Sequence, residues 1–268
     1  MSSQYHVQGM SILIMGGTTG LGLSAAEKLV ADGAQVVVVS RSAEHVEDAL
    51  KKLGAAASGL VGDAAQADTS DRAVALAVES FGRLDALYHV AGGSGRSSGD
   101  GVLHDLTDEG WHYTVDLNLS SVVFSNRAAV RQFRQQGGGG CILNMSSVLG
   151  WSPSPRYFAS HAYAASKAAV IGFSQSIASY YASEGIRVNV IAPALFETPM
   201  SARACGDAEI MRFVATKQPL DGGRAGLPSD ADGAACFLLS RDAGFITGQV
   251  IAVDGGWTVS EGQYGGAR

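Results

Sequence analysis

The chain has 268 residues, of which 46% are hydrophobic and 16% are charged, a composition that is typical of globular proteins and excludes an intrinsically disordered chain. A chain of this length buries a core large enough to fold without a disulfide or a structural metal. The net charge of −6 at pH 7 argues against a nucleic-acid partner, which would favour a basic surface.

No membrane or targeting segment is evident in the sequence. No stretch approaches the ~20 consecutive apolar residues that cross a bilayer, so we expect no membrane association. Residues 1–9 lack the basic start and apolar run of a signal peptide. Cys141, Cys205 and Cys236 lie far apart without a CxxC pair, which favours a reducing, cytoplasmic setting. The histidines match no zinc-ligand spacing, so we expect no metal site.

Short apolar runs rich in β-branched residues alternate along the chain with longer segments of helical periodicity. The predicted strands are Ser11–Met15, Gln35–Ser40, residues 59–62 (the weakest), 86–90, 141–145, 187–191 and 249–253. The clearest helical segments are residues 23–31, Ala43–Leu53 and residues 71–81. Continuous apolar strands favour a parallel sheet that is covered on both faces. The alternation therefore predicts an α/β fold, with a single Rossmann-type doubly wound parallel sheet of about seven strands.

We find no internal repeat and no linker, so we expect one domain over residues 1–268. Residues 195–228 form the longest segment without a strand signal. Such an insertion is often a lid over a binding site, whereas the alternative is a pair of surface helices that pack on the sheet. The sequence leaves both open.

A glycine-rich turn, Gly16-Gly17-Thr18-Thr19-Gly20-Leu21-Gly22, follows the first predicted strand and precedes a helical pattern. Glycines let the backbone approach a pyrophosphate closely, and the helix N-terminus offers free N–H groups and the positive end of its dipole. The spacing differs from the best-known dinucleotide fingerprint, so the prediction depends on the position of the turn in the chain. We predict that Gly16, Thr18, Thr19, Gly20, Leu21 and Gly22 bind a dinucleotide; a plain βα turn is the alternative.

The end of the second predicted strand carries Ser40-Arg41-Ser42 and no carboxylate. An acidic residue at this position would bind the adenosine ribose of NAD, whereas an arginine accommodates the 2′-phosphate of NADP. Arginine also matches phosphate oxygens with a fork of donors. We therefore favour NADP as the cofactor, with NAD as the alternative if Arg41 is an ordinary surface residue.

Tyr163 and Lys167 lie four residues apart at the start of a predicted helix, so they share one face. An ammonium group beside a phenol is expected to lower the pKa of the phenol, which suits proton transfer. This pair alone is common, but Ser147 follows the strand 141–145 directly upstream. Since ligands bind at the carboxyl ends of parallel strands, Ser147 and Tyr163 are expected to converge on one substrate oxygen.

With these motifs taken together, the chain resembles the short-chain dehydrogenase/reductase family over nearly all of its length. The motifs that carry the resemblance are, in order, Gly16-x-x-x-Gly20-x-Gly22, Ala91-Gly92, Asn118-Leu119, Asn144-Met145-Ser146-Ser147, Tyr163-x-x-x-Lys167, Arg187-Val188-Asn189-Val190-Ile191-Ala192-Pro193 and Val253-Asp254-Gly255-Gly256.

The resemblance implies a role for each matched residue. Tyr163 would be the general acid or base, Lys167 would hold the nicotinamide ribose, Ser147 would bind the substrate oxygen, and Asn118 would anchor a water that links Lys167 to solvent. The implied cofactor contacts beyond the glycine turn and the Ser40-Arg41-Ser42 segment are Asp63, Ala64, Ala91, Gly92, Tyr163, Lys167, Phe196 and Thr198.

Three departures from the family pattern bear on function. His89-Val90 stands where an Asn pair is usual, and we expect this change to remove hydrogen bonds that tie the following loop to the cofactor region. Thr19 stands where NADP-preferring members often carry a basic residue, which leaves Arg41 as the main phosphate ligand. Ser147 and Tyr163 lie about three residues further apart than is typical, and we expect the extra residues, within 151–160, to bulge over the substrate site.

The resemblance implies an NADP(H)-dependent oxidoreductase that interconverts a carbonyl and an alcohol of a small molecule. A 3-oxoacyl thioester reductase is one candidate, and an NAD-dependent alcohol, sugar or steroid dehydrogenase is an alternative. A non-catalytic cofactor-binding protein, which only the His89-Val90 change favours, is a further one. The helix predicted over residues 163–184 is rich in small residues, as in family members that assemble into dimers or tetramers, so we expect a homo-oligomer. The glycine- and serine-rich segment 92–101 is expected to be a flexible loop, and a contact with substrate, with Arg96 as the residue to test, is the alternative.

Overall fold

The computed structural model describes residues 5–262 and contains one seven-stranded sheet, in which every strand pair is parallel. The strand order is β3-β2-β1-β4-β5-β6-β7. The strands are β1 (Ser11–Met15), β2 (Gln35–Ser40), β3 (Ala57–Val61), β4 (Ala86–His89), β5 (Gly140–Met145), β6 (Ile186–Pro193) and β7 (Val250–Val253). The predicted doubly wound α/β fold is therefore confirmed.

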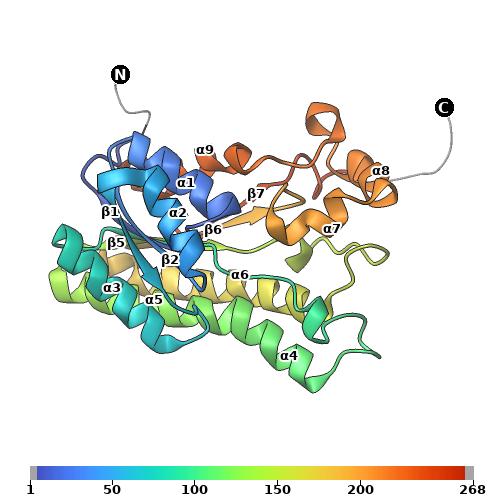
Figure 1. Cartoon of the computed structure of the whole chain (residues 1–268), viewed down its shortest axis with the longest axis horizontal. Coiled ribbons are helices and arrows are strands. Elements are labelled where there is room, and N and C mark those ends of the chain that lie inside the picture. The colour runs from blue at the N-terminus through green and yellow to red at the C-terminus, as the bar shows by residue number, and fades with distance from the viewer. Residues whose placement is uncertain (1–4, 263–268) are drawn as a thin grey trace.

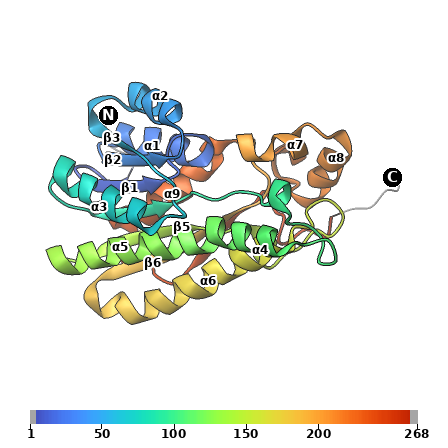
Figure 2. The same ribbon diagram turned by 60° about the horizontal axis from the view of Figure 1, so that its bottom comes forward.

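Helices cover both faces of the sheet (Figures 1 and 2). One face carries α1 (Gly20–Ala31), α2 (Ala43–Leu53) and α9 (Asp232–Leu239), and the other carries α3 (Ala67–Phe81), α5 (Ser121–Gln136) and α6 (His161–Tyr181). Successive strand residues supply the two cores: Ile12 and Ile14 pack on the side of α1, and Leu13 and Met15 pack on the side of α3. Since both faces are buried, the strands read as continuous apolar runs in the sequence.

The predicted boundaries differ from the structure where the sequence lacks a sharp signal. The weak strand predicted at residues 59–62 occupies Ala57–Val61, at the edge of the sheet. The long helix predicted from residue 163 begins at His161 and ends at Tyr181, followed by a 3₁₀ turn at Ala182–Glu184. β6 is longer than predicted because it pairs with β5 from Ile186 and with β7 as far as Pro193.

Residues 195–228 contain two short helices, α7 (Ala202–Cys205) and α8 (Ala208–Lys217), beyond the carboxyl end of β6 (Figure 1). The two ends of the segment are tied together, because Gly226 donates to the Leu195 carbonyl at 2.9 Å. Its helices pack in a separate small core, with Val214 against Trp257, rather than on the sheet. The predicted pair of sheet-packed surface helices is wrong in that respect.

Within residues 5–262 no helix is long and apolar enough to span a membrane. The remaining helix, α4 (Asp108–Val115), leads through a π-helical turn at Asp116–Ser120 into α5.

Candidate active site

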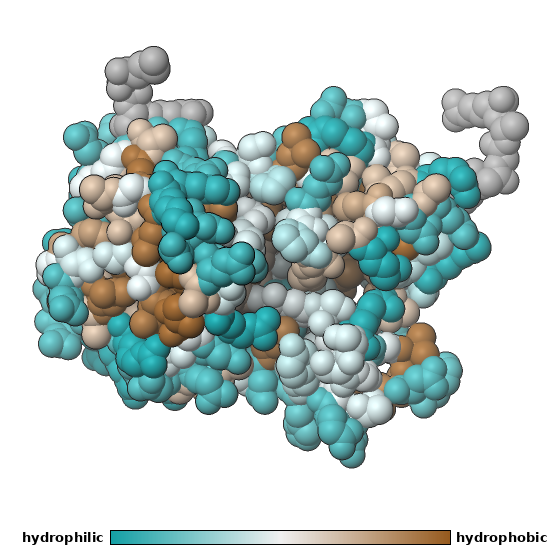
Figure 3. Space-filling model, viewed as in Figure 1, coloured by the Kyte–Doolittle hydropathy of each residue, from teal (hydrophilic) through white to brown (hydrophobic). Residues whose placement is uncertain are grey.

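A cleft of about 520 Å³ runs across the carboxyl ends of the strands. Its walls come from the turn after β1, the ends of β2 and β5, the loops after β3, β4 and β6, and the first turns of α6. The space-filling view is hollowed near the middle of this face, with hydrophilic residues along the rim (Figure 3). This is the edge of the sheet at which doubly wound folds bind ligands.

The glycine turn lies at one wall of the cleft and requires glycine for steric reasons. Gly16 has φ +85°, and a Cβ there would lie 2.8 Å from the Ala91 nitrogen. A Cβ on Gly22 would lie 2.1 Å from the Gly16 carbonyl oxygen. Thr19, the N-cap residue of α1, makes no side-chain cap, so the N–H groups of the first turn keep no side-chain acceptor. A backbone cradle with such donors fits the pyrophosphate of a dinucleotide.

The end of the cleft near β2 and β3 contains most of the residues expected to meet the adenosine. Ser40, Arg41, Asp63 and Ala64 line it, and Arg41 is exposed. Ser42 does not line the cleft, contrary to the prediction, because its hydroxyl caps α2 by accepting from the His45 N–H at 3.2 Å.

His45 lines the cleft beside Arg41, and the sequence analysis missed it. Ser42 is a typical N-cap residue, and this signal would have placed the first turn of α2, and with it His45, at the end of β2.

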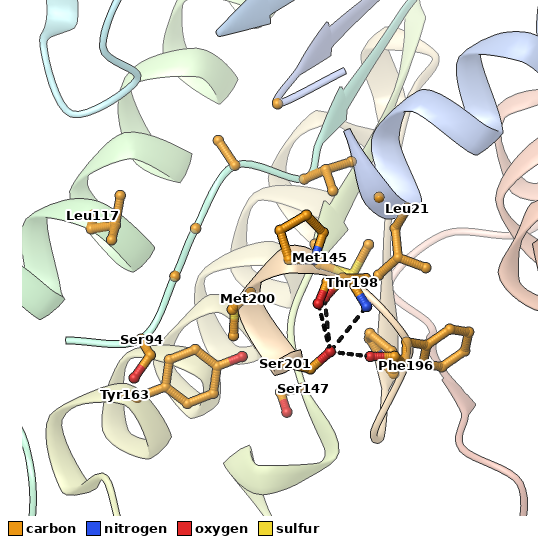
Figure 4. A pocket seen from close by; sticks show the side chains of 18 of the residues that line it. Leu21, Ser94, Leu117, Met145, Ser147, Tyr163, Phe196, Thr198, Met200 and Ser201 are labelled. Atoms are coloured by element: carbon orange, nitrogen blue, oxygen red, sulfur yellow. Dashed lines mark hydrogen bonds between the residues drawn. The ribbon is translucent and has the colours of Figure 1, made fainter. Parts of the chain in front are cut away.

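The three residues expected to react come together at the floor of the cleft. Ser147 follows β5, and Tyr163 and Lys167 lie on the first turns of α6. Figure 4 shows the side chains of Ser147 and Tyr163 next to each other. The Lys167 ammonium donates to the Met145 carbonyl at 3.0 Å and lies 5.5 Å from the centroid of the Tyr163 ring.

Burial controls the ionisation of both groups. Burial raises the pKa of Tyr163 to about 12, while a hydrogen bond with the Ser147 hydroxyl acts in the opposite direction. Burial also lowers the pKa of Lys167 to about 8. The pKa of Tyr163 therefore lies above its ordinary value, in the direction opposite to the one expected from the sequence, because burial disfavours the phenolate. At pH 7 the Tyr163 phenol is neutral and able to donate its proton.

Asn118 is fully buried in the π-helical turn and holds the loop that follows β4. Its Nδ2 donates to the carbonyls of Gly93 and Thr114, both at 2.9 Å, and its Oδ1 accepts from the Gly93 N–H at 3.0 Å. A Cβ on Gly92 would lie 2.8 Å from this Oδ1 and 3.3 Å from the Lys167 Nζ. The Asn118 amide and the Lys167 ammonium therefore both lie close to the backbone of Gly92.

His89 occupies the position where the family usually has the first asparagine of a pair, and it is fully buried. Its Nε2 lies 3.1 Å from the Ala91 carbonyl, and its Nδ1 lies 2.7 Å from the Ser125 hydroxyl. Because a carbonyl only accepts, the proton lies on Nε2 and Nδ1 accepts from Ser125. Burial, and to a lesser degree the charge of Lys167, lowers the pKa of His89 to about 3, so the ring is neutral.

The loop after β4 is therefore not left without side-chain hydrogen bonds. His89 ties the Ala91 carbonyl to Ser125 of α5.

Asp100 is a structural neighbour of Tyr163 that the sequence analysis missed. Its two carboxylate oxygens accept from the backbone N–H groups of Ala162 and Tyr163, both at 3.0 Å, and it is 5% exposed. Ser160, at the N-cap position of α6, makes no side-chain cap. The carboxylate from the preceding loop therefore replaces the local cap and fixes the helix turn that carries Tyr163.

The loop after β6 brings Phe196 and Thr198 to the cleft, as expected. The Ser201 hydroxyl is hydrogen-bonded to the Phe196 carbonyl and accepts from the Thr198 N–H at 3.0 Å (Figure 4). A Cβ on Gly20 would lie 3.3 Å from the Thr198 Cγ2, so this loop closes against the start of α1.

The segment with extra residues also reaches the cleft, because Phe158 and Ser160 line it. No group of three possible metal ligands exists among residues 5–262.

Comparisons with known proteins agree with this geometry. A family model described as Enoyl-(Acyl carrier protein) reductase matches residues 16–258. Dehydrogenase/reductase SDR family member 4 of Homo sapiens is 34% identical over 247 residues, which cover 91% of this chain and 86% of that protein. The chain belongs to the short-chain dehydrogenase/reductase family. This short-chain dehydrogenase/reductase is therefore an oxidoreductase.

Further similar proteins of the family differ in their names. 3beta-hydroxysteroid dehydrogenase 1 of Eggerthella lenta is 34% identical over 264 residues, covering 97% of this chain and 98% of that protein. A solved short-chain type dehydrogenase/reductase from Mycobacterium ulcerans is 34% identical, with a TM-score of 0.88 and coverage of 96% and 92% of the two chains. The family and fold of this short-chain dehydrogenase/reductase are thus established, whereas the names of its relatives do not agree on a substrate.

Proposed function

We propose that this enzyme is an NADP(H)-dependent oxidoreductase that interconverts a carbonyl and an alcohol, with Tyr163 as the proton donor and acceptor. One observation carries the proposal. The side chains of Ser147 and Tyr163 lie next to each other at the floor of a cleft that also contains the glycine turn and Arg41.

Each residue around the reacting atoms has a separate role. A nicotinamide cofactor, when bound, would supply a hydride to the carbonyl carbon or accept one from the alcohol. Ser147 donates a hydrogen bond to the substrate oxygen and orients it towards Tyr163. In the reductive direction the neutral phenol gives its proton to that oxygen. Lys167 holds the ribose hydroxyls and stabilises the phenolate that forms, because its ammonium lies 5.5 Å from the ring centroid.

The Tyr163→Phe variant tests the assignment of the proton donor. Because the hydroxyl is lost while the ring is kept, we expect kcat to fall by about 100-fold or more. The thermal stabilisation by NADP should remain close to that of the wild type. Tyr157→Phe is the matched control, since the Tyr157 hydroxyl bonds to Glu209 outside the reacting centre. Full turnover by Tyr163→Phe would contradict the mechanism.

Arg41 underlies the proposed preference for NADP. It is exposed at the end of β2 and forms no ion pair within residues 5–262, so its guanidinium is available to a 2′-phosphate. We expect NADP to raise the melting temperature more than NAD does at equal concentration. Arg41→Ser should reduce the shift with NADP and leave the shift with NAD unchanged. A shift with NAD alone in the wild type would overturn the preference.

A 3-oxoacyl thioester stays within the proposal as one substrate class. Reduction of simple ketones without any reduction of acetoacetyl thioesters under the same conditions would remove it.

The proposal also covers organisation beyond the cleft. We infer that residues 1–268 form one domain, that residues 195–228 act as a lid over the substrate, and that the enzyme is a homo-oligomer. The lid assignment is supported by the position of Phe196, Thr198 and Arg203 in the wall of the cleft.

A further inference from the structure

Two arginines, Arg96 and Arg203, line the substrate end of the cleft, from the loop after β4 and from α7. Each is held by the loop between β5 and α6. The Arg96 guanidinium donates to the Ala159 carbonyl at 3.2 Å, and the Arg203 guanidinium donates to the Tyr157 carbonyl at 3.4 Å. Each guanidinium thus makes one hydrogen bond to a neutral acceptor, and the remaining N–H donors of its fork are available to a ligand.

The carboxylates nearest to these arginines are engaged elsewhere. Asp100 accepts from the first N–H groups of α6. Glu209 pairs with Arg156 at 2.6 Å and accepts from the Tyr157 hydroxyl at 2.9 Å. Neither Arg96 nor Arg203 forms an ion pair within the part of the chain that the structure describes.

The substrate end of the cleft is therefore positive. Asp63 is the one acidic residue among the described residues that line the cleft, and it lies at the adenosine end after β3. Lys167 adds a third cation at the floor. Burial, followed by repulsion from Arg203, lowers the pKa of Arg96, while the charge of Asp100 acts in the opposite direction. Two guanidinium groups that are close enough to repel each other, neither of them in an ion pair within residues 5–262, form a binding site for an anion.

The substrate end also has apolar walls. Its walls are formed by Leu149, Phe158, Leu195, Met200 and Trp257. A ligand that fits both features has an apolar body with an anionic group at one end and the reacting carbon at the other.

We propose that the substrate is a ketone, or the corresponding alcohol, with an apolar body and a terminal carboxylate or phosphate that Arg96 and Arg203 bind together. The anionic group lies at the arginines, while the carbonyl oxygen lies at Ser147 and Tyr163. The assignment of the reacting end rests on the proposed function, whereas the anion subsite rests on the two arginines alone.

The test uses keto acids of increasing length, 4-oxopentanoate, 5-oxohexanoate and 6-oxoheptanoate, each beside its methyl ester and its phosphonate analogue. The measured quantity is the ratio of kcat/KM for the acid to kcat/KM for the ester. We expect this ratio to exceed about 10 at the chain length that spans the distance from the arginines to Tyr163, because hydrogen bonds to charged groups are stronger than those to neutral groups. The phosphonate arm decides between a carboxylate and a phosphate as the preferred anion.

Arg96→Gln and Arg203→Gln should each lower the ratio by about tenfold, and Arg96→Lys by less, since lysine keeps the charge without the fork. Arg212→Gln is the matched control, because Arg212 is exposed on α8 and does not line the cleft. The KM for the acid should also rise with ionic strength while the KM for the ester stays constant.

The two proposals fail in different ways. Equal reduction of acids and esters, with a ratio that neither arginine variant changes, would overturn the anion subsite and leave the carbonyl chemistry in place. Absence of any reduction would overturn the proposed function. In that case binding tests the anion subsite. The thermal shift that 5-oxohexanoate gives in the presence of NADP is compared with the shift that its methyl ester gives. Equal shifts in the wild type and in Arg96→Gln would refute it.

Discussion

At the scale of single residues, burial moves both reacting groups towards their neutral forms. The pKa of Tyr163 rises to about 12 and the pKa of Lys167 falls to about 8. The phenol therefore keeps the proton that reduction consumes. The burial of the Lys167 ammonium costs free energy of folding, because a group that is charged at pH 7 has been removed from water.

The cost of burying Lys167 can be measured as a function of pH. Its pKa in the folded state, about 8, lies below the ordinary value of 10.5. The unfolded chain therefore binds the proton more tightly between these values, and the free energy of unfolding rises with pH from about 8 to 10.5. Lys167→Met removes this dependence. We expect the variant to be inactive and about 1–3 kcal/mol more stable at pH 7.

Urea denaturation of both proteins at pH 7 and pH 10 checks this prediction. The difference in the free energy of unfolding between the variant and the wild type should shrink at the higher pH. Taking this difference cancels the titration of the tyrosines that both proteins share. A variant that is less stable than the wild type at pH 7 would show that the Met145 hydrogen bond outweighs the desolvation.

The sequence identifies the reacting residues but not the residues that position them. Ser147, Tyr163 and Lys167 are readable because a strand end and a four-residue helix spacing are local patterns. Asp100 and His89 act on the backbone of Tyr163 and of Ala91 through contacts that only the folded chain creates. The sequence indicated only that amide hydrogen bonds are lost at His89, whereas the structure shows that His89 makes hydrogen bonds of its own.

At the scale of elements, the start of α6 is the part on which the proposed chemistry depends. This helix has no side-chain cap of its own, and Asp100 accepts its first N–H groups from the loop after β4. A carboxylate at a helix N-terminus also interacts favourably with the helix dipole. The cap therefore joins the element that carries Tyr163 to the loop that carries Arg96 and contacts Asn118.

We predict that Asp100→Asn slows turnover more than it weakens binding. The amide keeps one acceptor and loses the charge, so about 1 kcal/mol of stability should be lost. We expect kcat to fall by about three- to tenfold, because Tyr163 moves with its helix turn. KM and the thermal shift with NADP should change little. Asp100→Glu, which keeps the charge, should recover part of kcat.

Asp105→Asn is the matched control, since this carboxylate is exposed and its nearest basic partner, His104, lies at 3.7 Å. A fall in stability of Asp100→Asn with unchanged kcat would limit Asp100 to a structural role.

Strands that are buried on both faces gave the sharpest sequence signals. β1 and β2 match the predicted ranges because each contains a continuous run of four buried apolar residues and is paired on both sides. β3 lies at the edge and is only partly buried, so its signal is weak and its range was misplaced. Residues 195–228 pack around Trp257, which is distant in sequence, so no local periodicity revealed their arrangement.

At the scale of the whole molecule, charge is distributed unevenly. The chain has a net charge of −6, yet Arg41, Arg96, Lys167 and Arg203 all line the cleft. The acidic surplus therefore lies outside the cleft, and an anionic cofactor or substrate is attracted towards its interior. Low salt should accelerate the binding of such ligands, since surface charges are screened at distances beyond about 10 Å at 0.1 M ionic strength.

The exposed side of α6 is the surface on which we expect copies of the chain to meet. Ala165, Ala168 and Gly172 are exposed there at helical spacing, which allows a second helix to approach closely. A Cβ at Gly172 meets no atom within 4 Å, so Gly172→Arg changes this surface without disturbing the fold of one chain. We predict that the wild type elutes as a multiple of the 27.6 kDa chain and that Gly172→Arg shifts to a smaller mass.

Light scattering coupled to size-exclusion chromatography measures this shift directly. Ala75→Arg is the matched control, because Ala75 is exposed on α3, away from α6, and this variant should keep the mass of the wild type. The circular dichroism spectrum of each variant confirms that a change in mass is not a change in folding. An unchanged mass for Gly172→Arg would exclude α6 as the contact between copies. The exposed edge of β7, where Ile251 is 39% exposed, would then be the next surface to substitute, since an unpaired edge strand also favours association.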